Sequence, residues 1–366
     1  MYMPGTRICK GSFMKKEPLK TWTLTMTGGS LLLLLVIVVV WAAAVGSVSV
    51  PFEQSAKIVL AKLPFVNSEK MLEGIPNPNK LIIWNIRLPR VLLAGLVGGG
   101  LAAAGVVMQA LFRNPLADPQ VLGISSGAAF GAAVAIAFGI TFTVSGISSI
   151  WLFAFVGAML TMVLVFYVAR IATSRSVTGI LLAGIACSSM LTAAITLMMM
   201  WNREKLEQIY LWMLGSFSSA SWVKVGFMSI VLVGALLCFI LLGRDLDLLS
   251  FGDQEAQSMG VSVKRTRTIA VLSTSLLVAA AVSVSGIIGF VSLIIPHIMR
   301  MLCGPKNRRL IPLSFLGGAI FMILCDMISR TAVPPNEIAV GAITQVTGAP
   351  FFLYLLWKER RKGERD

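Results

Sequence analysis

The chain has 366 residues, of which 57% are hydrophobic and 13% are charged, and its mean hydropathy is +0.85. Soluble domains carry about 25% charged residues, so this composition excludes an ordinary soluble protein and indicates a polytopic membrane protein. The net charge of +15 forms no basic stripe with interleaved aromatic residues, which argues against a nucleic-acid partner.

The first predicted span lies within residues 28–51, and the second covers residues 91–112. In the second span Gly95, Gly99 and Ala103 recur at every fourth position. Small residues at this spacing allow two helix backbones to approach closely in lipid, so we expect this helix to pack against other helices. Residues 48–87, rich in Pro and Asn, are expected to form a long outer loop.

Residues 119–169 carry no charge and are long enough for two helices of about 20 residues each. The polar stretch T-F-T-V-S-G-I-S-S would join them. Residues 268–305 predict two short helices that turn near Ser285, Gly286 and Gly289. The remaining spans are predicted at residues 176–202, 225–243, 311–328 and 338–357.

The expected fold is therefore an all-α polytopic membrane protein, with about ten transmembrane helices within residues 29–357. Lys and Arg concentrate in cytoplasmic loops, and placing both termini in the cytoplasm puts 21 of the 31 basic residues inside. Residues 1–28, residues 244–267 and the basic tail at 358–366 are then cytoplasmic. No convincing small-residue cleavage site precedes Pro51, so the first apolar segment is expected to remain as a helix of a cell-membrane protein.

The five cysteines form no C-x-x-C pair, and four of them lie in or beside predicted spans. We interpret them as small core residues, and no metal or other cofactor is expected. They are Cys9, Cys187, Cys238, Cys303 and Cys325.

Three arginines, Arg87, Arg90 and Arg330, are expected at the outer ends of spans, against the positive-inside trend. They could reach lipid headgroups, or they could form a docking surface for an acidic partner, because guanidinium groups pair bidentately with carboxylates. Asp326 lies one helical turn before Arg330, and an ion pair between them is the favoured interpretation of that aspartate.

The loop at residues 244–267 is the most mixed in charge among the predicted inner loops. Its pattern predicts two short amphipathic helices with a break at Gly252, although a simple solvated loop would show similar composition. Such helices could be gripped by a hydrolysing motor. The chain has no G-x-x-x-x-G-K-[ST] phosphate loop, so it is not expected to be an enzyme itself, and ATP-driven work would need another subunit.

G-I-S-S-G at residues 123–127 matches the G-x-S-x-G pattern of serine hydrolases, and His297 and Asp326 could be cast as its partners. That pattern has catalytic meaning on a strand-to-helix turn above a parallel sheet. Here it opens an apolar helix, where Gly and Ser usually serve close packing. A membrane hydrolase is therefore a weak alternative.

Five motifs in order resemble the permeases of iron-siderophore and vitamin B12 ABC importers. The resemblance extends from about residue 30 to residue 357. The motifs are R-L-P-R at 87–90, R-N-P-L-A-D-P at 113–119, G-D-x-x-A-x-x-x-G at 252–260, G-F-V-S-L-I-I-P-H-I-M-R at 289–300 and A-V-G-A-I-T-Q-V-T-G-A-P-F-F at 339–352.

The resemblance implies a second permease subunit, as a homodimer or heterodimer, two cytoplasmic ATP-binding subunits and an extracytoplasmic substrate-binding protein. It further implies that the three arginines receive acidic residues of that binding protein. The stretch at 252–260, including Gly252, Asp253, Glu255, Ala256 and Gly260, would enter the ATPase. The fifth span would line the translocation pathway, with Ser188, Ser189, Thr192 and Thr196 at spacings that could share one face.

The favoured function is thus the permease of an importer for an iron(III)-siderophore chelate. Haem or cobalamin is an alternative cargo that no residue distinguishes. An ion-coupled secondary transporter is an alternative of a different class, and it would require carboxylates embedded in the membrane and inverted repeats.

Overall fold

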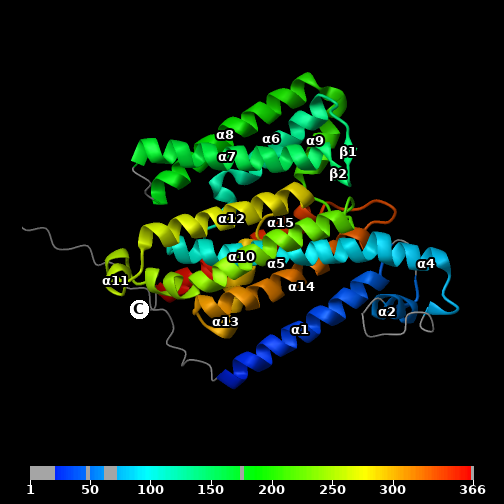
Figure 1. Ribbon diagram of the computed structural model, residues 1–366, viewed down its shortest axis with the longest axis horizontal. Coiled ribbons are helices and arrows are strands. Elements are labelled where there is room, and N and C mark those ends of the chain that lie inside the picture. Colours follow the sequence, from blue (N-terminus) through cyan, green and yellow to red (C-terminus); the bar gives the residue numbers. More distant parts are fainter. Residues whose placement is uncertain (1–20, 47–49, 62–71, 174–176, 364–366) are drawn as a thin grey trace, which may run out of the picture.

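A computed structural model describes residues 21–46, 50–61, 72–173 and 177–363 (Figure 1). Helices make up nearly all of the described structure. The long ones are α1 (Thr21–Ala44), α5 (Leu88–Phe112), α6 (Ile124–Ala137), α7 (Ser149–Thr173), α8 (Val177–Trp201), α10 (Trp222–Leu249), α12 (Val263–Ser285), α13 (Val291–Cys303), α14 (Asn307–Thr331) and α15 (Val340–Gly363).

Short elements connect these helices. They are α2 (Phe52–Leu60), α4 (Asn77–Leu81), the π-helix η1 (Ile82–Arg87), the 3-10 helices η2 (Pro119–Leu122) and η3 (Arg203–Lys205), α9 (Leu206–Met213) and α11 (Asp253–Ser258). Strands β1 (Thr143–Val144) and β2 (Ile147–Ser148) pair antiparallel between α6 and α7. Ser145 and Gly146 turn this hairpin with φ of 51° and 81°, the positive values that match the twist of paired strands.

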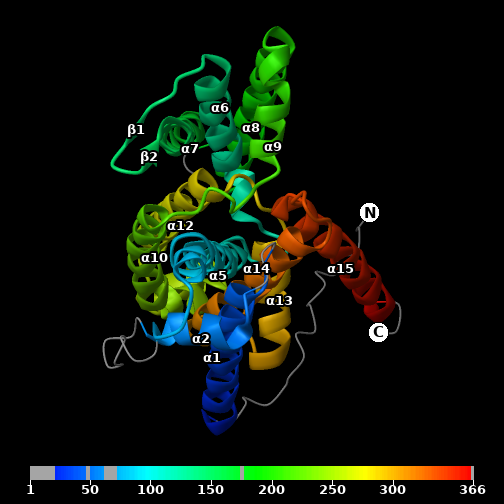
Figure 2. The same ribbon diagram turned by 90° about the vertical axis from the view of Figure 1, so that its right-hand side faces the viewer.

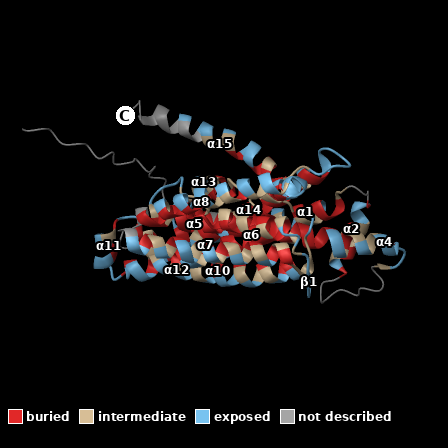
Figure 3. Cartoon of the chain, turned by 90° about the horizontal axis from the view of Figure 1, so that it is seen from above, coloured by how far each residue is buried: buried red, intermediate tan, exposed pale blue. Residues whose placement is uncertain are grey.

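Helix α5 runs through the centre of the molecule, with α1, α10, α12, α13 and α14 around it (Figure 2). Buried residues concentrate along α5, whereas exposed residues lie on the outer faces of the surrounding helices (Figure 3). Its glycines explain the central position. A Cβ atom built on Gly98 would lie 2.4 Å from the carbonyl oxygen of Gly318 on α14, so only glycine permits this approach.

The predicted small-residue face of the second span is confirmed. Gly95 faces Ile323 of α14, and a Cβ atom on Gly99 would lie 2.4 Å from the Phe315 ring. Cys187, Cys303 and Cys325 are buried free thiols and Cys238 is half-buried, as expected for core residues, while Cys9 lies outside the described residues.

Helices α6, α7, α8 and α9 stand together beside this central group, against α12 (Figure 2). Their contact is again made by glycine, because a Cβ atom on Gly131 of α6 would lie 2.0 Å from the Phe153 carbonyl oxygen of α7. The fold is therefore two helix groups held at close backbone distances.

All ten predicted spans coincide with helices, in the predicted order. In the described part of the chain, seven are long and apolar enough to cross a membrane: α1, the continuous helix 77–112 that ends with α5, α7, α8, α10, α12 and α14. Helices α6 and α13 are shorter, at 14 and 13 residues. The protein is an integral membrane protein of the polytopic α-helical class.

Several predicted boundaries were wrong. Residues 48–87 are not simply a loop, because α2, α4 and η1 lie within them and the helix of the second span begins at Asn77. The first helix begins at Thr21, inside the expected N-terminal segment, and α15 extends to Gly363 through most of the expected tail. Helix propensity does not explain all of these extensions, because the helix of the second span continues through Pro89 and α1 continues through Gly28.

Two further boundaries differ at the loops. Helix α10 continues to Leu249, so the first short helix expected in residues 244–267 is the end of α10, and the break at Gly252 is confirmed. Helix α12 is 23 residues long rather than short, because it begins at Val263 among charged residues. The predicted turn after it is confirmed at Gly286, which has φ of 73°.

The two ends of the bundle differ. Helix α11 lies at the same end as the first residues of α1 and the last residues of α15, while α2 and α4 lie at the opposite end (Figure 1). We refer to these as the inner and outer ends, following the predicted orientation, which stays a prediction.

Candidate functional site

The outer end contains a cluster of buried charges around Arg90 of α5. Its guanidinium donates a hydrogen bond from Nε to Asp326 Oδ1 at 2.9 Å, and two more from Nη1 and Nη2 to the Glu337 carboxylate at 2.8 and 2.9 Å. Arg330 Nε lies 3.2 Å from Asp326 Oδ2, so the predicted Asp326–Arg330 ion pair is confirmed. The two positive and two negative charges of this cluster therefore balance one another.

Arg87 and Arg330 also bind the last turn of α1. Arg87 Nη1 donates to the carbonyl oxygens of Ala43 and Ala44 at 3.1 and 2.6 Å. Arg330 donates to those of Ala42 and Val45 at 2.9 and 3.1 Å. The last carbonyls of a helix lack intrahelical partners and carry partial negative charge, so two guanidinium groups stabilise this end of α1.

The three arginines lie together at one end of the bundle, but they do not form an open basic surface. Arg87, Arg90 and Arg330 are 5%, 6% and 7% exposed. Lipid snorkelling does not describe them either, because their donors are used within the chain. Asp326 is fully buried between two arginines, as a structural ion pair requires.

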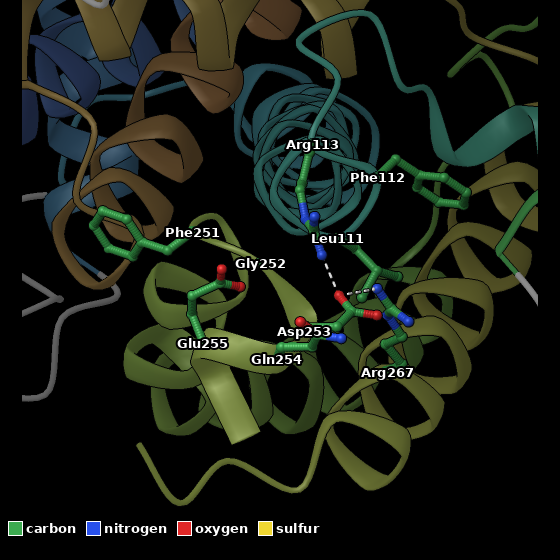
Figure 4. A pocket seen from close by; sticks show the side chains of 9 residues that line it. All are labelled: Leu111, Phe112, Arg113, Phe251, Gly252, Asp253, Gln254, Glu255 and Arg267. Atoms are coloured by element: carbon green, nitrogen blue, oxygen red, sulfur yellow. Dashed lines mark hydrogen bonds and ion pairs between the residues drawn. The ribbon is translucent and has the colours of Figure 1, made fainter. Parts of the chain in front are cut away.

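The inner end contains the loop predicted to meet an ATPase. Asp253, the first residue of α11, accepts a hydrogen bond from Arg113 after α5 and another from Arg267 of α12 at 2.7 Å (Figure 4). These contacts join three elements that are distant in sequence. They border an open pocket of about 630 Å³, which Phe251, Gly252 and Glu255 also line.

The predicted loop residues have different surroundings. Ala256 is fully buried and packs within this chain, whereas Phe251 and Met259 beside it are 72% and 51% exposed. Gly252 has φ of 145°, and Glu255 follows in the first turn of α11. Gly260 has φ of 86° with open space around it. The exposed apolar residues, not Ala256, offer the surface that a partner could contact.

A polar layer below this loop was not predicted. Arg300 Nη2 donates to Gln109 Oε1 at 2.8 Å, and Gln109 Nε2 donates to the Ser292 carbonyl oxygen at 3.1 Å, which links α5 to α13. Burial raises the pKa of the nearby Asp118 carboxyl in the connecting loop, although hydrogen bonds from Gln120 and Ser292 act in the opposite direction. The charge of Arg300 in an otherwise apolar stretch was the signal available in the sequence.

The four pathway candidates on α8 do not share one environment. Ser189, Thr192 and Thr196 lie on its exposed face, and the Thr196 hydroxyl donates to the Thr192 carbonyl oxygen at 3.0 Å. Ser188 is half-buried beside Gly123. The exposed face of α8 is otherwise apolar, with Leu182, Ile185, Met190, Leu197 and Met200 all more than half exposed.

The G-I-S-S-G segment does not form a hydrolase turn. A 3-10 helix, η2, precedes it in place of a strand, and Ser125 is buried in the first turn of α6. Asp326 is occupied by Arg90 and Arg330, and His297 of α13 stacks edge-on against Phe351 with ring centroids 6.5 Å apart. These residues form no nucleophile–base–acid relay like that of a catalytic triad.

Together, the glycine-packed bundle and the paired charges at its outer end define the class as a polytopic α-helical membrane protein. Comparison with known families specifies it further. The FecCD transport family matches residues 33–358, nearly the whole chain, so the chain belongs to this family. Its members are permease subunits of ABC transporters, in which a separate subunit hydrolyses ATP.

Individual relatives agree with this assignment. The ABC transporter permease protein YvrB of Bacillus subtilis is 42% identical over 284 residues, covering 77% of this chain and 80% of its own. The hemin transport system permease protein HmuU of Yersinia pestis is 40% identical, covering 76% and 84%. A solved structure described as an inward-facing metal-chelate type ABC transporter is 33% identical, with a TM-score of 0.78 over 91% of this chain and 99% of that one.

Proposed function

We propose that this ABC permease carries an iron(III)-siderophore chelate across the cell membrane, as one of two permease subunits of an importer that also contains two ATP-binding subunits and an external binding protein. The support is the likeness to a metal-chelate type transporter over nearly the whole chain. Relatives are also named for hemin, cobalamin and molybdate. The identity of the cargo as a ferric siderophore is therefore proposed in addition to the family assignment.

The binding protein is proposed to dock at the outer end. Glu337 is the exposed member of the charge cluster around Arg90, with 41% of its side chain accessible. An acidic side chain of the binding protein would reach Arg90 by replacing Glu337 in the same bidentate geometry. Arg87 and Arg330 would support this contact by fixing α1 behind it.

The ATP-binding subunit is proposed to contact the inner end through residues 251–260. Phe251 and Met259 would enter the partner's cleft, and the Asp253 ion pairs would transmit the movement of α11 to α5 and α12. The apolar exposed face of α8 is proposed to contact the second permease subunit, with Ser189, Thr192 and Thr196 facing the pathway.

The substrate is tested by reconstituting the permease with its ATPase and binding protein in proteoliposomes. ATP-dependent accumulation of a ⁵⁵Fe-loaded siderophore is expected, with little accumulation of hemin or cyanocobalamin at the same concentration. Accumulation of hemin or cyanocobalamin in preference to the ferric chelate would reject the siderophore assignment. Uptake driven by an ion gradient without ATP would reject the ATP-driven mechanism.

A further inference from the structure

A second cavity, of about 460 Å³, opens at the outer end between α9, α10 and the segment before α15. Ser218, Ser219 and Gln208 are exposed at its mouth, while Lys224 of α10 is 8% exposed and lies deeper. The volume falls within the range of about 300–1,000 Å³ that is usual for small-molecule sites.

Lys224 is a buried cation without a carboxylate partner among the residues that the structure describes. Its Nζ donates one hydrogen bond, to Ser219 Oγ at 2.7 Å. An ammonium group has three N–H donors, so two remain for a ligand in the cavity. A hydroxyl satisfies one donor but does not neutralise the charge, and a buried charge is costly unless it is paired.

The single carboxylate among the described lining residues, that of Glu337, does not compensate Lys224. Glu337 lines the same cavity, but both of its oxygens accept hydrogen bonds from Arg90. Arg90 and Arg330 are balanced by Asp326 and Glu337, which leaves the charge of Lys224 uncompensated within the described part of the chain. Lys224 also lies in the first turn of α10, where the helix dipole disfavours a cation and favours an anion.

The rest of the lining indicates an organic anion. Ser216, Ser218 and Ser219 supply hydroxyl groups, and Trp151, Trp212 and Ile338 supply apolar surface. A tetrahedral inorganic ion would occupy a small part of this volume and would leave the indole rings without contact. A carboxylate-bearing molecule would use both kinds of surface.

We propose that this cavity binds a carboxylate-bearing ligand, with Lys224 Nζ and the Ser219 hydroxyl donating to one carboxylate oxygen each. The inference rests on the proposed function in one respect, because the ligand is taken to be the organic part of the imported chelate as it leaves the binding protein. Binding at the cavity itself requires neither ATP nor the other subunits, so it can be measured separately from transport.

The test uses the purified full-length permease in lipid nanodiscs, with citrate as the probe and inorganic phosphate as the comparison. Thermal stabilisation as a function of probe concentration gives an apparent affinity for each variant. Lys224→Met is expected to weaken citrate binding about tenfold or more, because a charged hydrogen bond is lost. Lys224→Arg is expected to retain most of the affinity.

Lys205→Met is the matched control, because this exposed lysine of η3 does not line the cavity. It is expected to bind citrate like the unmodified chain. A second measurement needs no variant. Bound citrate should protect Lys224 of the unmodified chain from chemical acetylation, and mass spectrometry measures how far each lysine is acetylated. The expected result is protection at Lys224 without protection at Lys205.

The proposal is overturned if citrate neither stabilises the chain nor protects Lys224, or if Lys224→Met binds citrate as well as the unmodified chain. Phosphate binding as strong as citrate binding would overturn the carboxylate assignment. Failure of the uptake experiment with intact citrate binding would reject the proposed function and leave the site in place.

Discussion

Arg90 and Glu337 lie 247 positions apart in the chain, and the guanidinium of one pairs through two hydrogen bonds with the carboxylate of the other. Because Arg90 also binds Asp326, this single side chain joins α5, α14 and the segment before α15. The outer end is therefore held by a compact charge network in which the removal of one member leaves others buried without partners.

Replacing Arg90 with methionine is expected to lower the free energy of unfolding by about 3–5 kcal/mol, because Asp326 would remain buried with its charge poorly compensated. Thermal unfolding of the purified variant in detergent measures this. Reversal of charge at both Arg87 and Arg90 should impair assembly as well as transport, since carboxylates would then face Asp326 and the α1 carbonyls. An unchanged melting temperature for Arg90→Met would show that the network contributes little.

The double variant Arg90→Met with Asp326→Leu provides the control. Removing both partners of a buried pair is often nearly neutral, so part of the lost stability should return. If the loss in free energy of unfolding of the double variant equals the sum of the losses of the two single variants, the loss at Arg90 comes from its packing and not from its charge.

The contrast between Arg330 and Arg90 shows what sequence could predict. Asp326 and Arg330 are four residues apart on one helix, so helical geometry alone gives their pairing. Glu337 was not predicted as the partner of Arg90, because that contact depends on where the segment between α14 and α15 lies against α5. Hydropathy located each helix, but the tertiary contacts of buried charges depend on the packed fold.

The loop at residues 252–260 gives the same lesson for the candidate site. Gly252 is a helix break visible in the sequence, and the structure confirms it. Ala256 was expected to enter the ATPase. An alanine is compatible with both a buried and an exposed position, so the sequence did not indicate which way it faces, and the packing of α11 buries it. Lys224 was overlooked because it lies at the edge of an apolar span, where lysines commonly reach toward water.

Gly98→Ala is expected to destabilise the chain by about 1–3 kcal/mol or more, because its Cβ would overlap the backbone of α14. Gly226→Ala on α10 is the matched control, since a Cβ atom there meets nothing within 4 Å. Helix propensity should make that change neutral or stabilising, by at most about 1 kcal/mol. Equal melting temperatures of the two variants would contradict the close approach of α5 and α14.

At the inner end, Phe251→Ser is expected to weaken assembly with the ATP-binding subunit while leaving the melting temperature of the isolated permease nearly unchanged. Ala256→Leu should have the opposite profile, because the added methylenes have no space in the packed core, and a loss of about 1–3 kcal/mol is expected. Co-purification of the ATPase and thermal unfolding measure the two effects. Normal assembly of Phe251→Ser would place the ATPase contact elsewhere.

Ser125→Ala is expected to leave uptake unchanged and to leave the stability of the chain the same or slightly higher. The Ser125 hydroxyl is buried and has no hydrogen-bond partner among the described residues, so its removal relieves a desolvated polar group and creates only a small change in volume. The purified chain should also resist labelling by a fluorophosphonate probe, because the candidate partners of Ser125 are engaged elsewhere: His297 packs against Phe351, and Asp326 pairs with two arginines. Uptake by the variant is measured alongside labelling of the unmodified chain, with a known serine hydrolase as the positive control for the probe. Labelling at Ser125 together with loss of uptake in the variant would show that this serine is reactive, and its role as a packing residue of α6 would then be wrong.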